Sequence, residues 1–390
     1  RTGNWRKEFD GIQYYNNSLT EIKIPTWYGV DVYAGTETVS GQRTNPEETK
    51  GTISYVGVSL PLLQNLVMDK RRAALQQAKI LVDLSHVQQA SALNDLLRDG
   101  LYAYWEWWEA YHLLQLADSS WQNARSRFLL VKKAWQLGDR PAIDTIEALA
   151  QVQSFDVNRL DALAQLARAE YGLSAYLWRD DNRPYDLPSG VVPKVETATE
   201  PLLLDRLMQA AATHPEVRQY NVKLASLQVD KKLKFQSLLP AVDLKYNQLA
   251  KGADLLETTK TPLFQNNYRF GISLSVPLRL SAGRGDYQQA KLKIEQTALE
   301  QVNKQVSIQT KLRQSYTEWQ QTTHQLSVQT GAVANYAALL RGEEIRFQNG
   351  ESSLFFLNAR EQKTLEARQK LVQLKAKNQK ALTAVKWAAG

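Results

Sequence analysis

An internal repeat constrains this chain more than any other feature of its sequence. Over residues 76–138 a single register holds without a gap, and identical residues recur 212 positions later. Repetition at a fixed offset indicates two copies of one supersecondary unit. The residues of the first copy that recur are Gln76, Gln77, Ala78, Lys79, Tyr104, Glu106, Trp107, His112, Gln136 and Gly138.

Short segments of alternating apolar and polar residues lie before this region in both copies. Residues 268–276 alternate over nine positions, and residues 55–60 show the same alternation in the first copy. Period two predicts a strand with one apolar face, and about nine residues suffice for a tilted strand to cross a bilayer. Preceding strands are expected at residues 30–33 and 242–246, which gives about four strands per chain. Residues 1–24 are expected to form additional strands and loops, and the number of these strands is not determined by the pattern.

Two long segments without proline follow the strands, at residues 62–137 and 279–349. Their apolar residues recur at steps of three and four, as in Leu93, Leu97 and Leu101, and form a narrow stripe. This spacing predicts coiled-coil helices. At 1.5 Å per residue each helix would be about 100 Å long, which is far more than helices in compact domains.

A glycine turn is expected at the end of each long helix. Glycine ends helices because it tolerates the left-handed conformation, and Asp or Ser then begins the next helix by capping it. The residues predicted to form these two tip turns are Gly138, Asp139, Gly350, Glu351, Ser352 and Ser353.

Shorter helices complete each copy. Return helices are expected at residues 145–178 and 353–388, and a third half-length helix at residues 202–237. Two half-length helices equal one long helix, so we expect them to stack end to end beside it. The first copy lacks an upstream counterpart of residues 202–237. We therefore expect the natural protein to carry such a helix, and a secretion signal before it, upstream of Arg1.

The expected domains follow this plan. They are strands of the first repeat at 1–60, its helices and tip turn at 61–179, a proline-rich equatorial linker at 180–201, a half helix at 202–238, strands of the second repeat at 239–278, and its helices and tip turn at 279–390.

These strands and helices require partners. A bilayer-length strand with unpaired edges cannot persist in lipid. Four strands are too few to close a barrel, whereas three copies would supply twelve. We therefore predict a mixed α/β membrane protein, built as a homotrimeric 12-stranded β-barrel that continues into a long α-helical coiled-coil barrel.

Composition excludes several other classes. The sequence contains no cysteine, which removes disulfides, thiolate metal sites and cysteine nucleophiles. Lys and Arg number 48 against 40 Asp and Glu, and this modest excess is spread along the chain, so a nucleic-acid partner is not expected. No apolar run is long enough for a transmembrane helix. No set of residues converges on a catalytic pocket, so we expect neither enzymatic activity nor a cofactor.

Three groups of residues carry a resemblance to a known family. They lie at positions 271–278 with 283 and 289–291, at positions 350–354 with 357–359 and 367–368, and at positions 214–217 with 239–240. With them the chain resembles the TolC family of outer-membrane efflux proteins, over nearly its whole length.

The resemblance implies a trimeric, passive exit duct in the outer membrane of a Gram-negative bacterium, with helices that cross the periplasm. It implies four partners: further copies of the chain, outer-membrane lipid, a periplasmic adaptor protein that docks at the tip turns, and the inner-membrane transporter of a tripartite efflux or type I secretion system. Iris-like movement of the tips would open the duct. A periplasmic adaptor or a soluble coiled-coil scaffold is the alternative, although neither explains two in-register hairpins with paired strands.

The family often places acidic residues of the helix after the second turn at a periplasmic constriction. Residues 354–358 contain no carboxylate, and Phe355 and Asn358 stand there instead. The first copy has Asp144 and Glu147 at equivalent positions. Threefold symmetry would gather these carboxylates near the axis, where they would repel or hold cations. An ordinary solvated helix start is the alternative.

Aromatic and histidine residues permit simpler interpretations. Trp27, Tyr28 and Tyr268 are candidates for an interfacial aromatic girdle. The recurrence of His112 as His324 favours one packing or surface position used twice, and we expect no metal site.

Two further clusters are expected to be structural. The cluster of Trp105, Trp107 and Trp108 predicts packing at a helix interface. We expect residues 283–286, Gly-Arg-Gly-Asp, to form a connector between the last strand and the second long helix.

Overall fold

The computed structural model describes every residue of the chain except 46–48, 189, 195–201, 261 and 277–279. Pro277 and Leu278 of the first motif, and residues 195–201 of the expected linker, lie outside the described residues. The chain divides into two compact units. The sheet unit comprises Arg1–His86 and Gln219–Gln301, and the helical unit comprises Val87–Arg218 and Val302–Gly390.

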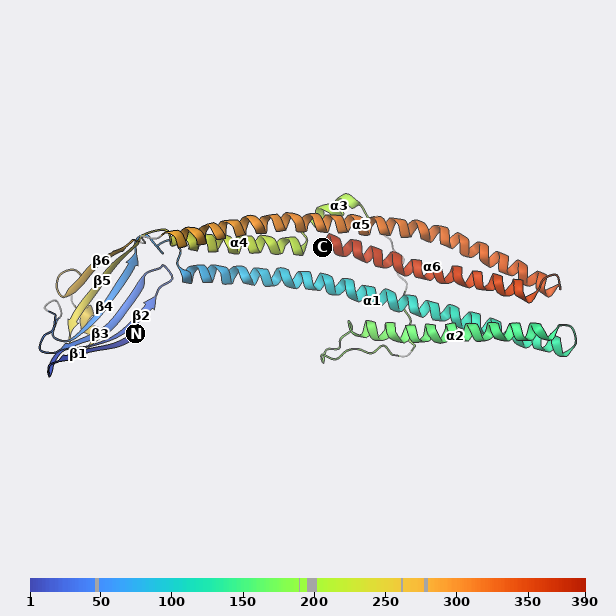
Figure 1. Ribbon diagram of the computed structural model, residues 1–390, viewed down its shortest axis with the longest axis horizontal. Helices are drawn as coiled ribbons and strands as arrows, with labels where there is room; N and C mark the ends of the chain where they lie inside the picture. Colours follow the sequence, from blue (N-terminus) through green and yellow to red (C-terminus); the bar gives the residue numbers. More distant parts are fainter. Residues whose placement is uncertain (46–48, 189, 195–201, 261, 277–279) are drawn as a thin grey trace. The chain divides into compact units, whose positions relative to one another are not determined.

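The sheet unit contains an antiparallel sheet with the strand order β1-β2-β3-β4-β5-β6 (Figure 1). Its strands are β1 (Thr2–Phe9), β2 (Ile12–Pro25), β3 (Asp31–Ser40), β4 (Gly51–Pro61), β5 (Ala241–Lys251) and β6 (Tyr268–Ser275). The two predicted strand pairs are confirmed as β3 with β4 and β5 with β6. Since β4 also pairs with β5, the two copies of the repeat share one sheet.

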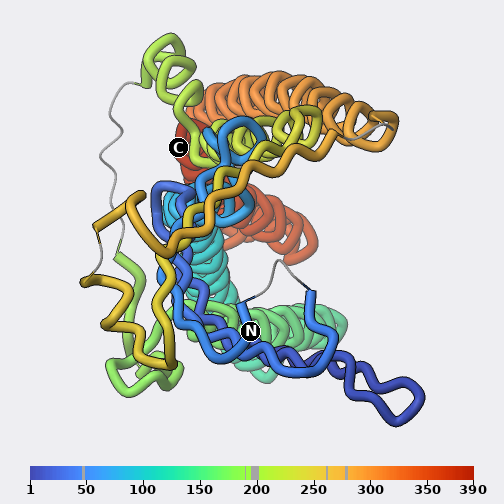
Figure 2. The backbone as a smooth tube through the Cα atoms, turned by 90° about the vertical axis from the view of Figure 1, so that its left-hand side faces the viewer, coloured from blue at the N-terminus to red at the C-terminus, as the bar shows by residue number. Residues whose placement is uncertain are grey.

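Residues 1–25 form a hairpin whose register shifts at a bulge between Lys7 and Glu8. Asp10 and Gly11, with φ of 50° and 71°, make the two-residue turn between β1 and β2, as expected for a hairpin turn with two positive φ values. Figure 2 shows the tip of this hairpin reaching past the other strands. The additional strands expected in residues 1–24 are therefore β1 and β2, which extend the four-stranded part to six strands in the described residues.

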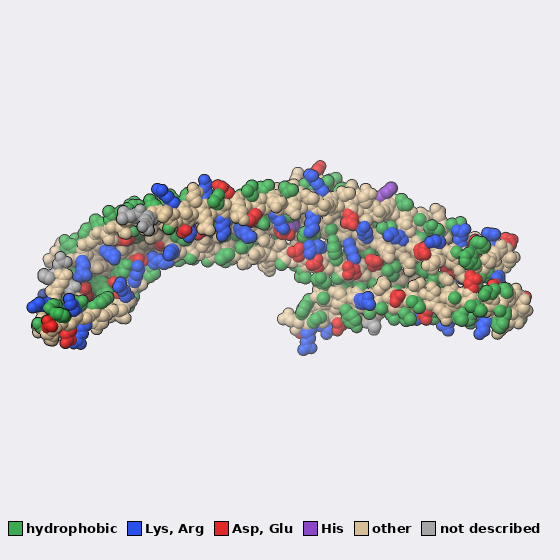
Figure 3. Space-filling model, viewed as in Figure 1, with side chains coloured by type: hydrophobic (Ala, Val, Ile, Leu, Met, Phe, Trp, Pro, Cys, Tyr) green, Lys and Arg blue, Asp and Glu red, His purple; other side chains and the backbone are tan. Residues whose placement is uncertain are grey.

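The two faces of the sheet differ in polarity. One face carries large, exposed apolar side chains, which Figure 3 shows along the border of the sheet. This apolar belt consists of Ile22, Ile24, Val58, Tyr268, Phe270, Ile272 and Leu274. On the opposite face Tyr55 donates a hydrogen bond to Glu21 at 2.8 Å, and Arg269 pairs with Glu37 at 3.4 Å. The alternation read from the sequence therefore separates an apolar face from a polar one.

The helices are α1 (Lys70–Gln136), α2 (Ala142–Ser174), α3 (Leu204–Ala211), α4 (Pro215–Gln236), α5 (Ser281–Gln348) and α6 (Leu354–Ala389), with a short 3-10 helix η1 (Leu255–Thr259). Both predicted long helices are confirmed as α1 and α5, although α1 begins at Lys70 and not at residue 62. Among the described helices, none has the length and apolar character needed to span a membrane.

The prediction of a connector at residues 283–286 is wrong, because these residues form the first turns of α5. Gly283 permits a helix to start at this place. A Cβ there would come within 3.1 Å of Leu238 and 3.2 Å of Ser237, so only glycine fits between α5 and the end of α4 without a shift.

The predicted half-length helix at residues 202–237 is interrupted. It consists of α3 and α4, which are separated by Ala212, Thr213 and His214. Pro215 causes the break because proline disfavours helical conformation in the residue before it and has no N–H to donate. As the first residue of α4, it occupies a position where that N–H is not needed.

In the helical unit, the end of α6 meets the start of α4 against the side of α5. Val217, Leu312 and Val385 are buried together there, with at most 5% of each side chain exposed. The predicted end-to-end arrangement of a return helix and a half helix beside a long helix is thus confirmed at this junction.

Candidate functional site

Both tip turns have the geometry that glycine provides. Gly138 and Gly350 adopt φ of +82° and +78°. The N–H of Asp139 and that of Glu351 each donate to a carbonyl five residues earlier, at 2.9 and 2.8 Å. This is the Schellman arrangement, in which the bond satisfies a carbonyl left free at the helix end. The role of the two glycines in ending the long helices is confirmed, whereas docking of a partner at these turns stays a prediction.

The start of α2 differs from the prediction, whereas α6 follows a serine as predicted. Pro141, and not Asp139, is the N-cap of α2, and Ser353 is the N-cap of α6. Within the described part of the chain neither residue makes a side-chain capping bond. Proline fixes φ near its helical value, −71° here, so conformational restriction replaces the expected side-chain bond.

A buried carboxylate lies beside the second tip turn. Glu343 of α5 is only 8% exposed and accepts a hydrogen bond of 2.5 Å from Ser352. Arg346 and Arg360 lie 3.6 and 3.8 Å from its oxygens. These charged residues line a hollow of about 630 Å³ that also contacts Gly342. Ser352 therefore fastens the turn to α5, a role that the sequence did not indicate.

A buried polar network joins the two hairpins of the chain near their tips. Arg127 of α1 makes two hydrogen bonds to the carboxylate of Glu361 on α6, at 2.7 and 2.9 Å. Arg127 also donates to Asn358 at 3.2 Å, and the amide of Asn358 donates to Glu147 of α2 at 3.2 Å. Arg127 and Asn358 together thus connect three helices. A guanidinium and a carboxylate that are joined by two hydrogen bonds form a strong and geometrically specific pair.

A second contact joins the two tips directly. The guanidinium of Arg140 lies 4.0 Å from the ring centroid of Phe347 and pairs with Asp144 at 3.3 Å. The cation–π contact links the first tip to the end of α5, and the ion pair fixes the arginine on its own hairpin. Val131 of α1, Ala148 of α2 and apolar residues of α6 form a buried cluster in the same part of the helical unit.

The candidate constriction residues fall into two groups. Asp144, Glu147 and Asn358 are all engaged in bonds within the chain. Phe355 is 65% exposed and packs edge-on against Phe356, which is 57% exposed. Sequence reasoning missed Arg127 and Glu361, for which the only available signal was a charge close to an apolar stripe.

A second junction in the helical unit centres on Trp387. Its indole N–H donates to Asp95 at 2.8 Å, and its backbone carbonyl accepts from Asn94 at 3.1 Å. Arg98 and Lys311 lie 4.7 and 4.1 Å from its rings. The end of α6 is thereby fixed to α1 and α5.

His214, in the break between α3 and α4, lies against the same tryptophan and is 2% exposed. Its Nδ1 accepts from the N–H of Glu216 at 3.2 Å, and its Nε2 lies 3.3 Å from the carbonyl oxygen of Trp387. An imidazole that accepts at Nδ1 and donates at Nε2 is neutral. Burial lowers the pKa of His214, which agrees with this assignment.

The candidate girdle residues bracket the apolar belt. Trp27 and Tyr28 are 63% and 83% exposed and lie in the turn between β2 and β3. Tyr268 begins β6 and pairs with Gln248 of β5. It lies at the end of the sheet opposite that turn. An aromatic residue at each end of an apolar band is typical of membrane barrels, and the girdle stays a prediction.

The tryptophan cluster on α1 is packed as predicted. Trp107 and Trp108 are each 4% exposed, and Trp107 contacts Leu173 of α2. In the described ranges no group of three or more His, Cys, Asp or Glu side chains is placed to hold a metal ion.

Comparisons with known proteins agree with this architecture. The family model described as outer membrane efflux protein matches residues 207–390. The fold resembles that of the outer membrane protein VceC from Vibrio cholerae, with a TM-score of 0.72, 15% identity, and coverage of 96% of this chain and 87% of that one. A comparison with curated proteins gives no significant match.

Two further channels share the fold. The Campylobacter jejuni CmeC outer membrane channel matches with a TM-score of 0.69 and 15% identity, over 96% of this chain and 77% of that one. The Neisseria gonorrhoeae MtrE outer membrane channel, solved in an open state, matches with a TM-score of 0.68 and 15% identity, over 94% and 80%.

A curled sheet with an apolar face, joined to two long helical hairpins, thus defines an outer-membrane channel subunit with a periplasmic helical part. Residues 207–390 of the chain match the outer membrane efflux protein family, and the chain as a whole shares the fold of TolC-family channels. This family consists of channel proteins, and the adaptor or scaffold alternative is not favoured.

Proposed function

We propose that three copies of this chain form a passive exit duct through the outer membrane. The observation that carries the proposal is the exposed apolar belt of the sheet. Ile272 and Leu274 of β6 are 63% and 66% exposed, and Ile24 of β2 is 56% exposed. A contiguous apolar face of this kind marks a surface that another apolar phase covers. Outer-membrane lipid covers this one.

Closure of the sheet requires several copies. The described strands form one open sheet whose first and last strands each have an unpaired edge. Unsatisfied backbone groups cost several kcal/mol each in lipid, so membrane-spanning strands occur only in closed barrels. A threefold ring of sheets satisfies both edges, and its polar inner face lines a water-filled passage.

The helical tips are the expected contact with the rest of the export system. Beside the two turns, Ile143, Ile146, Phe355 and Phe356 are each more than half exposed. Such apolar groups at the ends of two hairpins suit a docking partner, for which we propose a periplasmic adaptor protein. An inner-membrane transporter of an efflux or type I secretion system would supply the cargo through that adaptor.

Opening is proposed to be an iris-like movement of the two hairpins. The bonds of Arg127, Asn358 and Glu361 tie α1 and α2 to α6 within one chain. Separation of the hairpins requires that these bonds break. Glu147 would then lose its bond to Asn358 and be free to face the axis, where three copies of it would repel one another and favour the open form.

The mass of the detergent-solubilised particle tests this function. We expect a trimer that fractionates with outer membranes and conducts ions in a planar bilayer. A monomer that stays soluble without detergent would refute the duct and would revive the scaffold alternative. Purification with bound proteins would identify the adaptor, and recovery of the trimer with no periplasmic protein would count against tip docking.

A further inference from the structure

We propose that the loop between β5 and β6 anchors the barrel in the lipid leaflet remote from the helices. This loop, called here the η1 loop, consists of residues 252–260 and 262–267 in the described part of the chain. It lies at the strand ends opposite to those that connect to α4 and α5. The inference rests on the proposed membrane barrel, and the partner is the acyl-chain boundary of that leaflet.

The η1 loop folds back over the face of the sheet that carries the apolar belt. Ser54 of β4 donates a hydrogen bond to the backbone carbonyl of Asp254 at 2.8 Å, and Gln248 of β5 donates to that of Asn266 at 3.0 Å. Gln248 is the ladder partner of Tyr268, and Ser54 lies on the same face of the neighbouring strand. The loop is therefore bound to the outer face of the sheet.

The outer face becomes polar just beyond the level of Tyr268, and the η1 loop covers this part. The outward residues there are Thr36, Thr38, Thr52 and Ser54. The 3-10 helix η1 contacts β3, β4 and β5, and Ser54 and Gln248 are only 0% and 4% exposed. Two residues along a strand span about 7 Å, so the covered patch begins about 7 Å from the belt.

The outer surface of the η1 loop is apolar. Leu256, Leu263 and Phe264 are 70%, 65% and 63% exposed. The centroid of the Phe264 ring lies 4.3 Å from that of Tyr246 and 6.2 Å from that of Tyr268, and both tyrosines stand on the belt side of the sheet. The apolar surface of the loop is thus continuous with the belt, and the lipid that covers the belt is its expected partner.

The backbone of the loop holds Phe264 in a strained conformation. Its φ is 62°, in the left-handed region where a bulky residue is an outlier. The N–H of Phe264 donates to the hydroxyl oxygen of Tyr246 at 2.9 Å, which fixes this conformation. Such strain persists where surrounding contacts hold it, and it clusters at functional positions. An exposed phenylalanine held in this way is expected to meet an apolar partner.

Charged groups on the same loop determine its depth. Glu257 and Lys260 form an exposed ion pair on and beside η1. Irregular backbone that faces lipid does not occur within the hydrocarbon region. Apolar side chains beside charged ones are typical of segments that lie at the boundary between headgroups and acyl chains. The η1 loop therefore lies at this boundary, with Leu256, Leu263 and Phe264 directed toward the chains.

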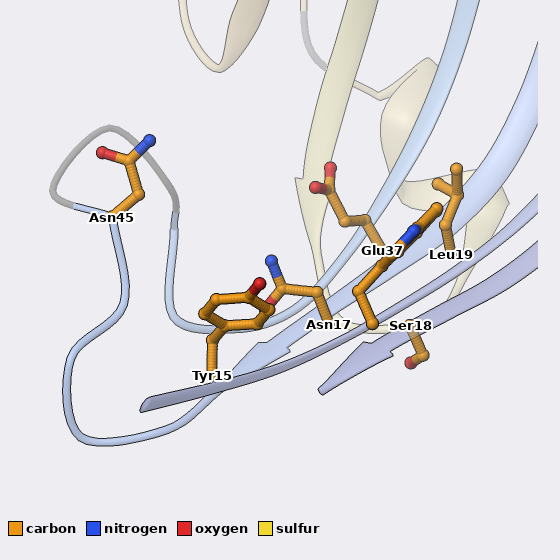
Figure 4. A pocket seen from close by; sticks show the side chains of 7 residues that line it. Tyr15, Asn17, Ser18, Leu19, Glu37 and Asn45 are labelled. Carbon is orange, nitrogen blue, oxygen red and sulfur yellow. The ribbon is translucent and has the colours of Figure 1, made fainter. Parts of the chain in front are cut away.

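The opposite face of the sheet has a separate hollow at this end. Trp5, Asn17 and Glu37 border a space of about 480 Å³ (Figure 4). Figure 4 shows Ser18 pointing to the other side of the sheet from Asn17. Of the described residues that line this hollow, none comes from the η1 loop. The loop is thus not a plug of this hollow, which agrees with an outward role.

Fluorescence quenching tests the anchor, because the sequence contains no native cysteine that would take up a label. Leu256→Cys and Leu263→Cys are labelled singly with a fluorophore in the full chain, and the trimer is reconstituted in phosphatidylcholine vesicles. Both side chains are exposed, so their replacement leaves the packed interior intact. We expect phosphatidylcholine that carries a nitroxide close to the headgroup to quench both labels strongly. A nitroxide at the chain end should quench them less, and aqueous iodide should have little effect.

Ile272→Cys and Ser273→Cys, adjacent on β6, are the matched controls for the lipid-facing and the polar face. Quenching of the loop labels by iodide and not by the nitroxide lipid would overturn the proposal, because the loop would then lie in water. Protection from both quenchers would also overturn it, because a neighbouring copy would then cover the loop.

The same controls separate a failure of the anchor from a failure of the duct. If the nitroxide lipids quench Ile272→Cys and leave both loop labels unaffected, the proposed barrel stands and only the anchor is refuted. If they leave Ile272→Cys unaffected as well, the belt does not face lipid, and the proposed barrel itself is refuted.

Discussion

Removal of one partner of the Arg127–Glu361 pair should shift the duct toward its open form. The side chains are 15% and 7% exposed, and two bonds of 2.7 and 2.9 Å join them. Glu361→Gln keeps the shape of the side chain but leaves the Arg127 guanidinium buried without a counter-charge. Breaking one side of a buried pair costs about 3–5 kcal/mol. Because Arg127 retains some exposure, we take the lower value, about 3 kcal/mol.

A loss of about 3 kcal/mol corresponds to roughly a 100-fold change in an equilibrium constant. If the pair is intact only when the hairpins are together, the ratio of closed to open channels should fall by about this factor. Single-channel recording in planar bilayers measures that ratio. Glu366→Gln provides the matched control on the same helix, since Glu366 and Lys363 form an exposed pair that contributes little.

A double variant separates loss of the pair from loss of packing. Arg127→Met with Glu361→Leu replaces two buried charges by apolar groups, which is often neutral for stability. We expect this variant to close more often than Glu361→Gln alone. An unchanged closed fraction in Glu361→Gln, or a double variant as open as the sum of the single changes, would refute the idea that the pair restrains opening.

Three further predictions concern the turn, the break and the belt. Gly350→Val should destabilise the second tip by about 1–2 kcal/mol and weaken adaptor binding, because φ is +78° there. Gly331→Val, inside α5 with open space around it, is the control, and equal adaptor binding by the two variants would contradict the role of the turn. Because burial lowers the pKa of His214 below 6.5, the unfolded chain binds a proton that the folded chain does not, so stability should fall as pH drops below about 6.5. His214→Gln should flatten the dependence of melting temperature on pH, and an unaltered slope would exclude His214 as its source. Ile272→Lys should reduce trimer insertion by about 2–4 kcal/mol if this residue faces the bilayer centre, whereas Ser273→Lys, on the polar face, should insert normally; similar losses in both would show that the faces are assigned wrongly.

Some of the fold could be predicted because it depends on local periodicity. The two-residue alternation at 268–276 and the helical spacing of the long segments report which face is buried, and that signal survives without knowledge of the partner. Gly138 and Gly350 were identifiable for a similar reason, since a helix end in left-handed conformation nearly demands glycine. The repeat then assigned the same plan to both copies.

The details at the candidate site were not available from local patterns. Ser352 could have capped α6, but it bonds instead to Glu343, which lies one turn before the end of another helix. Arg127 and Glu361 are 234 positions apart, and nothing in either segment marks them as partners. The N-cap at Pro141 likewise depends on how the first tip turn is restricted, and side-chain propensity alone favoured Asp139.

Residue spacing was sufficient to predict the repeat, the length of the long helices and the amphipathic strands. Tertiary contacts were needed to place β2 against β3 and to connect α1, α2 and α6 through Arg127 and Asn358. Those features depend on contacts between distant segments. Register and pairing are fixed by the partner surface and leave no periodic trace in either strand or helix alone.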